Sequence, residues 1–396
     1  MEDKILDIHR SPFRIVLAIT GGGTEAIGEL LRHGGGSDTL LEAIVPYGKE
    51  SLHDLIGKEP DKYASAETAK DMAMSTYRRA LLLDSKSEKP DPQSLIGIGI
   101  TCKLAKQGRE REGRQHELYF ASQSYYKTTV SGVNLKKKGS REEQESIAAD
   151  YILDRIASLC NPEKYAVQGI QEKDTAERTL ILENEAEANN ETSELLLKTL
   201  ESINSGNNVP RKVNLGISAN KPGIILSGSF NPCHKNHIEM AMIASEKYDM
   251  PVDFEISLAN VDKPPINYIS LKERVDSVRA CMQDMRGGSA GNIYLSNSPL
   301  FADKAILFPD SVFLIGTDTL NRLFNVNYYR EGEDMQSLIE HFSKYNTKFL
   351  VFRRKESQIC SEIDIPDICE IVSYDCYTDD GTSSTKIRNE RKCSFK

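Results

Sequence analysis

Apolar runs and amphipathic stretches alternate in the first part of the chain, and this pattern predicts an α/β domain. The apolar run 14–19 predicts a buried strand, and the stretch 25–32 that follows a glycine-rich turn predicts a helix. The runs 95–100 and 117–121 predict two further strands. In residues 141–159 the apolar positions share one helical face, so this stretch predicts the helix that closes the domain.

The same alternation returns at Gly223 and continues nearly to the C-terminus. Helical stretches lie between the predicted strands, and this order favours a doubly wound, mostly parallel, Rossmann-like sheet. The expected fold class is therefore α/β, with two α/β domains. The predicted strands of the second domain are 224–227, 254–258, 293–296, 312–315, 349–352 and 368–373.

A polar stretch separates the two α/β segments. Residues 171–221 contain few aromatic residues and many Glu, Asn and Ser residues. A helical pattern covers 193–203, and the remainder has the composition of an exposed linker. The expected organisation is a first domain over 1–170, a linker with a short helix over 171–221, and a second domain over 222–396.

Composition and charge exclude several classes of protein. The 396 residues carry a net charge of −9, which disfavours general nucleic-acid binding. No apolar run approaches the roughly 18 residues that a membrane span needs, and the charged N-terminus lacks a signal-peptide core. The eight cysteines form no CxxC pair, which is typical of thiols in a reducing compartment and predicts no metal site. We therefore expect a cytoplasmic location, with access to the nucleus left open.

The segment from Gly228 to His237, with the sequence GSFNPCHKNH, is a candidate phosphate site. It follows an apolar run and leads into a predicted helix. A Gly/Asn/Pro turn lets backbone N–H groups approach an anion, and the positive end of the helix dipole favours negative charge there. The two histidines, three residues apart, can donate hydrogen bonds to charge that develops on a phosphate. The pattern therefore indicates nucleotide chemistry.

Three further features of the second domain fit such a site. Asp318 in the sequence GTDTL follows an apolar run, and a carboxylate at the end of a strand can accept ribose hydroxyls. The segment Thr382 to Arg388, with the sequence TSSTKIR, has the hydroxyl residues of a helix start and a cation suited to phosphate oxygens. The third feature is Lys263, just beyond a predicted strand.

These motifs, in this order, resemble the nicotinamide mononucleotide adenylyltransferases of the HxGH nucleotidyltransferase superfamily, over about residues 222–388. The resemblance implies ATP and a nicotinamide or nicotinate mononucleotide as substrates, with Mg²⁺ accompanying ATP, and it leaves a homo-oligomer open. It implies catalytic roles for three residues, which are His234, His237 and Arg388. It implies nucleotide-binding roles for Gly228, Ser229, Phe230, Lys263, Gly316, Asp318, Ser384 and Thr385. Arg274 is a weaker carry-over.

The chain departs from this family at one position of the motif. Asn236 stands where HxGH has glycine, and Asn tolerates unusual backbone angles better than most residues. Two other functions stay open on the sequence. One is a nucleotidyltransferase of the same fold with another specificity, such as a cytidylyltransferase. The other is a nucleotide sensor without catalysis.

The first domain has its own pattern of short motifs. They are Gly35-Gly36-Ser37, residues 43–47 (AIVPY), Leu55-Ile56-Gly57, residues 64–69 (ASAETA) and Gly139-Ser140-Arg141. Their order resembles the C-terminal domain of the competence-damage-inducible (CinA) family, over about residues 14–156. Some members of that family deamidate nicotinamide mononucleotide.

That resemblance implies a candidate N-terminal site of Thr20, Tyr47 and Arg141. The family carries a nucleophilic serine before a Thr-Gly-Gly segment, and one match places this serine at Ala18, which has no hydroxyl. A shifted match places it at Thr20, which could act as a nucleophile only beside a base. The lysine expected five residues after Tyr47 is Leu52. The alternative is a degenerate domain that binds a nucleotide, dimerises or regulates.

Overall fold

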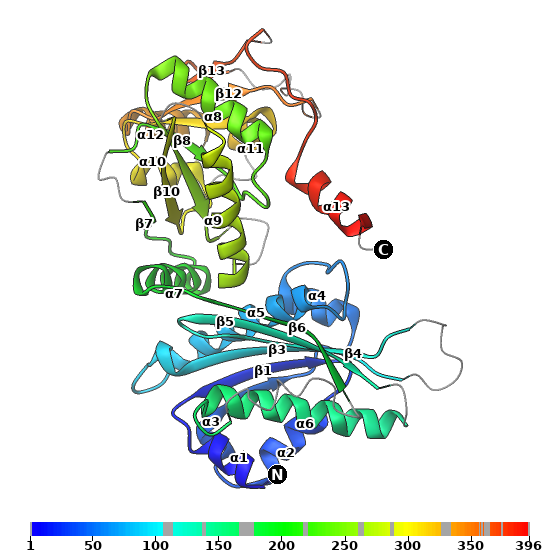
Figure 1. Ribbon diagram of the computed structural model, residues 1–396. Coiled ribbons are helices and arrows are strands. Elements are labelled where there is room, and N and C mark those ends of the chain that lie inside the picture. The colour runs from blue at the N-terminus through cyan, green and yellow to red at the C-terminus, as the bar shows by residue number, and fades with distance from the viewer. Residues whose placement is uncertain are drawn as a thin grey trace. The chain divides into compact units, whose positions relative to one another are not determined.

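The computed structural model describes two compact units (Figure 1). It describes residues 2–105, 114–136, 140–165, 178–216, 221–259, 265–285, 289–325, 334–355, 357, 359, 365–373 and 375–394. The first unit runs from the N-terminus to Ser193, with the short additions Ile203–Ser205 and Lys263–Ile269. The second unit contains Glu194–Ser202, Gly206–Asp262 and Ser270–Lys396.

A six-stranded mixed sheet forms the centre of the first unit, in the order β2-β1-β3-β4-β5-β6. The first three of these strands are parallel, and β3 to β6 form an antiparallel meander. The strands are β1 (Arg14–Thr20), β2 (Leu40–Ile44), β3 (Leu95–Lys103), β4 (Glu117–Gln123), β5 (Lys127–Leu135) and β6 (Arg178–Glu187).

Helices cover both faces of this sheet. On one face α1 (Glu2–His9), α2 (Glu25–Arg32) and α6 (Arg141–Cys160) pack on a core that contains Leu17 and Phe120. Successive strand residues point to opposite faces, so Ala18 contacts the other layer, where α4 (Lys49–Ile56) and α5 (Ala66–Asp84) lie. The short α3 (Gly36–Thr39) and η1 (Pro92–Ser94) complete the unit.

The stretch expected to be an exposed linker contains two strands. Strand β6 forms the edge of the first sheet, and β7 (Lys212–Asn214) joins the second sheet. The predicted helix is present as α7 (Asn190–Ser205). The correction has a physical reason: most side chains of β6 are exposed or half-buried, and its Glu185 pairs with Lys127 at 2.8 Å. An edge strand with exposed acids has the composition of a linker.

A seven-stranded sheet forms the centre of the second unit, in the order β13-β12-β11-β8-β9-β10-β7. Only β7 is antiparallel to its neighbour, so the expectation of a mostly parallel, doubly wound sheet is confirmed. The chain begins at the centre and winds outward in both directions, which makes β8 and β11 the switch point. The parallel strands are β8 (Ile224–Ser227), β9 (Val252–Ser257), β10 (Ala290–Ser296), β11 (Val312–Gly316), β12 (Lys348–Phe352) and β13 (Cys369–Ile371).

Helices also cover this second sheet on both faces (Figure 1). Helices α10 (Phe301–Leu307) and α12 (Met335–Lys344) pack on an aromatic cluster that includes Phe313 and Phe349. The other helices are α8 (Lys235–Tyr248), α9 (Tyr268–Gln283), α11 (Thr317–Leu323) and α13 (Ser384–Ser394). Within the described part of the chain, every helix is too short or too polar to cross a membrane.

Candidate functional site

The predicted nucleotide motifs of the second unit lie at the carboxyl ends of β8 and β11. The loop that starts at Gly228 follows β8, and Gly316 ends β11 and precedes α11. These two strands are neighbours, with Leu226 paired to Leu314. Ligands of open α/β sheets bind in the crevice beside such a switch point. The fold therefore brings two motifs almost 90 residues apart to one edge of the sheet, where ligands of this fold bind.

The loop from Gly228 to His234, named the phosphate loop for its predicted role, is held in place by contacts on both sides. The Gly228 N–H donates to the Glu255 carbonyl at 3.1 Å, and the buried Phe230 ring covers Gly228 so closely that a Cβ there would lie 3.0 Å from it. Phe230 has a φ of 43°, in the left-handed region that side chains rarely adopt. Ser229 is exposed, and its carbonyl accepts a hydrogen bond from Arg274 at 3.2 Å. The loop is thus fixed while Ser229 faces solvent.

The two histidines lie together at the start of α8. Their ring centroids are 3.9 Å apart, and the His237 ring also meets Phe230 edge to face at 5.1 Å. The backbone N–H of His234 donates to Nδ1 of His237 at 3.2 Å. Because Nδ1 accepts this bond, the neutral ring carries its proton on Nε2. The free N–H donor of His237 is therefore on Nε2.

Both histidines are neutral donors at physiological pH. Burial and the nearby Arg354 lower the pKa of His234 to about 4. Burial, followed by His234 and Arg354, lowers the pKa of His237 well below its usual value. Nδ1 of His234 is buried without a hydrogen-bond partner. An anion beside these rings would favour the protonated form and oppose this shift.

Gly316 makes room for a charged contact that sequence reasoning missed. A Cβ at Gly316 would lie 2.5 Å from the carboxylate of Asp318 and 2.9 Å from the guanidinium of Arg354. These two charges approach to 3.8 Å, although Asp318 Oδ1 has no hydrogen-bond partner. The buried Thr317 hydroxyl donates to the Ser357 carbonyl at 2.6 Å and accepts from the Arg354 N–H at 3.0 Å. The GTD motif and the end of β12 are therefore joined.

The start of α13 contacts the phosphate loop directly. The Ser384 hydroxyl donates to the Pro232 carbonyl at 2.7 Å, and Arg388 donates to the Asn231 carbonyl. Arg388 also donates to the Thr385 hydroxyl at 3.0 Å. These contacts hold the start of α13 against the loop that leads into the two histidines.

Arg274 and Arg354 add positive charge that the sequence motifs did not emphasise. Burial, with repulsion from Arg388, lowers the pKa of Arg274 to about 10, so it remains a cation near neutral pH. Its Nε is buried without a hydrogen-bond partner. Arg354 follows β12, and the carboxyl ends of parallel strands meet at one edge. That rule was the signal available for Arg354. For Arg274 the signal was the family resemblance, in which it is a weaker carry-over.

A buried ion pair lies beneath the phosphate loop. Lys304 of α10 contacts the Glu255 carboxylate at 2.7 Å and the Ser227 hydroxyl at 2.6 Å. The side chains of Glu255 and Lys304 are 0% and 6% exposed. Ser227 and Ser296 donate to the two oxygens of Glu255 at 2.6 and 2.5 Å. This network joins the carboxyl ends of β8, β9 and β10.

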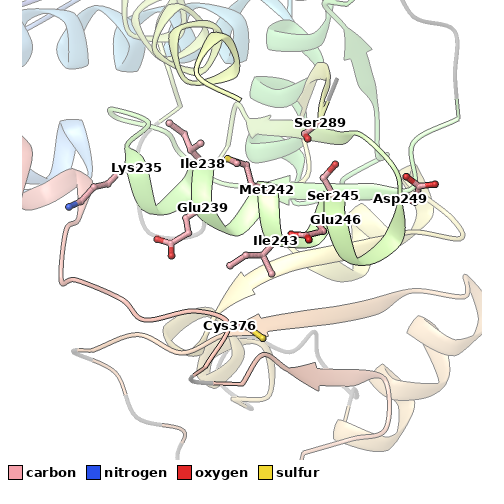
Figure 2. Close-up of a pocket in the computed structure, with 10 residues that line it drawn as sticks. All are labelled: Lys235, Ile238, Glu239, Met242, Ile243, Ser245, Glu246, Asp249, Ser289 and Cys376. Atoms are coloured by element: carbon pink, nitrogen blue, oxygen red, sulfur yellow. The ribbon is translucent and has the colours of Figure 1, made fainter. Parts of the chain in front are cut away.

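The remaining nucleotide-binding prediction in this unit concerns Lys263, which lies outside the described residues. A groove with a volume of about 630 Å³ runs along α8 and differs from the candidate site (Figure 2). Figure 2 shows Glu239 and Ile243 of α8 facing this groove, with Cys376 on the segment opposite. Neither histidine of the motif lines it.

Of the predicted residues of the first unit, Thr20 ends the parallel strand β1, Tyr47 follows β2 and Arg141 begins α6. The Thr20 hydroxyl donates to the Pro46 carbonyl at 3.0 Å, beside the exposed Tyr47. Arg141 donates to the Ala105 carbonyl at 2.8 Å. No acidic or basic side chain in the described residues hydrogen-bonds to Thr20, so its contacts supply no general base.

The carboxylate of Glu145 lies at the start of α2, directly after the turn Gly21-Gly22-Gly23. Glu145 of α6 accepts from the Thr24 hydroxyl at 3.0 Å and from the Glu25 N–H at 3.3 Å. This is the position at a helix N-terminus that an external phosphate would take. No group of three or more His, Cys, Asp or Glu residues suited to a metal ion occurs in the described portions of either unit.

Solved structures and a curated relative resemble parts of the chain. The N-terminal region resembles the CinA superfamily protein from Enterobacter cloacae, with 18% identity, 40% of this chain and 89% of that chain covered, and a TM-score of 0.33. For the competence/damage-inducible protein CihA from Agrobacterium tumefaciens the values are 17%, 40%, 90% and 0.30. A Schizosaccharomyces pombe protein named "Putative nicotinamide mononucleotide adenylyltransferase" is 28% identical over 131 residues. That match covers 32% of this chain and 51% of the relative, so the chain spans about half the length of the curated relative it matches.

A family model covers most of the second unit. The matched family is described as cytidylyltransferase-like, and the match spans residues 225–390. This range contains β8 with its phosphate loop, β11 with the GTD motif, and the start of α13. The expectation of a nucleotidyltransferase-type domain in this half is thereby confirmed. Residues 225–390 therefore resemble a cytidylyltransferase-like domain.

Proposed function

We propose that this domain transfers AMP from ATP to the 5′-phosphate of nicotinamide mononucleotide or its nicotinate analogue, which yields the dinucleotide and pyrophosphate. The carrying observation is the convergence of the phosphate loop, the two histidines and the start of α13, joined by the contact between Ser384 and Pro232. Backbone N–H groups, neutral imidazole donors and cations together suit a polyphosphate.

The reaction needs no covalent enzyme intermediate. An oxygen of the mononucleotide 5′-phosphate attacks the α-phosphorus of ATP, and a new P–O bond forms. The bond between the α-phosphorus and the oxygen that bridges to the β-phosphorus breaks, and pyrophosphate leaves with that electron pair. The attacking phosphate is already ionised near neutral pH, so no general base is required. Catalysis then rests on positioning and on stabilising the charge that develops on the phosphates.

Each residue of the site has a role in this proposal. His237, as a neutral Nε2–H donor, and His234 stabilise charge on the α-phosphate and on the leaving group. Arg388 and the helix start at Ser384 hold the triphosphate. Asp318 accepts hydrogen bonds from ribose hydroxyls. Mg²⁺ enters as part of the MgATP substrate, bound by phosphate oxygens.

The nicotinamide acceptor is supported by the name of the curated relative and by the GTDTL sequence of the adenylyltransferase branch. The family description also fits transfer of CMP to another phosphorylated acceptor. A nucleotide sensor is the third reading. Two neutral histidine donors beside half-buried cations favour turnover over binding alone, since donors aimed at developing charge are what catalysis needs.

One assay distinguishes these functions. The purified full chain is incubated with Mg²⁺, nicotinamide mononucleotide and either ATP or CTP, and dinucleotide and pyrophosphate are measured by chromatography. NAD formation with ATP, at a rate that His237→Ala lowers by about 10²-fold or more, supports the proposal. Product from CTP and not from ATP, or ATP binding without turnover, would overturn it in favour of the second or third function.

A further inference from the structure

Asn236 occupies the glycine position of the HxGH motif and uses its side chain there. The residue is 1% exposed. Its amide nitrogen donates to Asp379 at 2.6 Å and to the Thr382 carbonyl at 3.3 Å. A glycine could make neither bond. The Asn236 side chain therefore connects the turn that carries His234 and His237, called the histidine turn, to the segment that leads into α13.

Asp379 is the centre of this connection. Its side chain is 6% exposed, and Arg354 lies 3.9 Å from it. Asp379 also accepts from the Gly381 N–H at 3.2 Å and from the Lys355 N–H at 2.8 Å. With the bond from Asn236, these contacts compensate the buried carboxylate, because they supply N–H donors and a nearby cation.

Three separate segments thus meet at one carboxylate. They are the histidine turn, the end of β12 with Arg354, and the approach to α13. Each segment also carries a residue of the candidate nucleotide site. We propose that the Asn236–Asp379 pair is a positioning clamp, which holds the start of α13 against the histidine turn so that the triphosphate meets a preassembled site. This inference rests on the proposed function, because it assigns the clamp to the same nucleotide.

Loss of the clamp should weaken nucleotide binding more than it slows the chemical step. Without it, the segment before α13 must be ordered when the nucleotide binds, so the loss falls on nucleotide affinity. The two histidine rings and their N–H groups remain in place, so the rate of the chemical step changes little. A bond to a charged group is worth enough to expect about a 10-fold or greater rise in KM and Kd for ATP. We expect kcat to stay within roughly 3-fold of wild type, since uniform binding is lost.

The test uses an exchange of the two partners in the full chain. Asn236→Gly restores the family motif and removes the clamp, and Asn236→Asp sets two carboxylates against each other. The double variant Asn236→Asp with Asp379→Asn returns an amide and a carboxylate in reversed positions. Glu246→Gln, on the outer face of α8, is the matched control. Thermal melting of each variant reports on folding.

We expect both single changes at Asn236 to weaken binding of MgATP, measured by titration calorimetry, and the exchange to recover most of the loss. Unchanged affinity in Asn236→Gly, or an exchange variant no better than Asn236→Asp at equal thermal stability, would overturn the clamp. If wild type binds MgATP without AMP transfer and the exchange still rescues binding, the clamp holds while the proposed function fails. Wild type that does not bind MgATP would overturn both.

Discussion

The hydroxyl of Ser384 donates a hydrogen bond to the carbonyl of Pro232 at 2.7 Å, across 152 positions of sequence. It joins two motifs that can be identified separately in the sequence but whose contact only the fold reveals. The bond places a helix start beside a loop and two histidines.

Replacement of His237 by alanine should lower turnover without unfolding the domain. The ring supplies an N–H donor to charge on phosphate, and loss of one such donor costs about 10²-fold or more in rate. Initial rates of pyrophosphate release measure the effect, with circular dichroism as the check on folding. A folded variant with the turnover of wild type would remove His237 from its assigned role.

Two replacements of Arg388 should distinguish the contribution of its charge to kcat/KM from that of its planar geometry. Arg388→Lys keeps a cation but loses the planar fork that contacts Asn231 and Thr385 together. We expect Arg388→Ala to lower kcat/KM for ATP by roughly 10²-fold, and Arg388→Lys to recover only part of that loss. Steady-state kinetics with varied ATP provide the comparison. Full recovery by lysine would show that charge alone is needed.

The stability of the free protein should fall as pH drops below about 6.5. His234 has an ordinary pKa of 6.5 and a folded pKa of about 4. Between these values the unfolded chain binds a proton that the folded chain does not, so the free energy of unfolding decreases with falling pH. Urea denaturation at pH 7, 6 and 5 measures this slope. His234→Gln, which does not titrate, should show a shallower slope over the same range.

Removal of one partner of the Glu255–Lys304 pair should lower the free energy of unfolding. Lys304→Met leaves a buried carboxylate without its cation, and such changes destabilise by about 3–5 kcal/mol. In Lys304→Met with Glu255→Gln the uncompensated charge is gone, so the double variant should be more stable than Lys304→Met alone. Chemical denaturation of the wild type, both single variants and the double variant gives the comparison. Additive effects would mean that the two charges are not coupled.

Thr20→Ala should leave any ammonia release from nicotinamide mononucleotide unchanged. The Thr20 hydroxyl donates to a backbone carbonyl, and its described contacts include no base to activate it. A coupled ammonia assay on the full chain, with the wild type measured in parallel, tests this expectation. Release by wild type that is lost in Thr20→Ala would restore the amidase hypothesis.

The second sheet was more predictable from sequence than the first. Strands such as β8 and β12 are buried apolar runs bounded by turn residues, and their pattern alone identifies them. Strand β5, with the sequence KTTVSGVNL, was not predicted because small polar residues fill it although most are buried. Edge strand β6 has the composition of a linker, because its exposed positions include Glu183, Glu185 and Glu187. Local pattern fails where a neighbouring strand, and not the side chain, supplies the stabilisation.

Some residues of the candidate site were predictable from the sequence, and others were not. The histidine turn, Asp318 and the start of α13 are short-range motifs, and each could be identified from adjacent residues. Arg354 and Asp379 have no such signature, since their roles come from contacts with Gly316 and Asn236. The sequence did identify Asn236 as a departure from the motif. What it could not show was the partner, which lies 143 positions away.

The distance between the histidine turn and α13 also sets an order of events during synthesis. The 152 positions between Pro232 and Ser384 take roughly 8–30 s to translate at about 5–20 residues per second. For that interval the nascent turn is exposed without its clamp or its helix start. The early folding of the emerging domain therefore proceeds without this contact and depends on the apolar strands of the sheet.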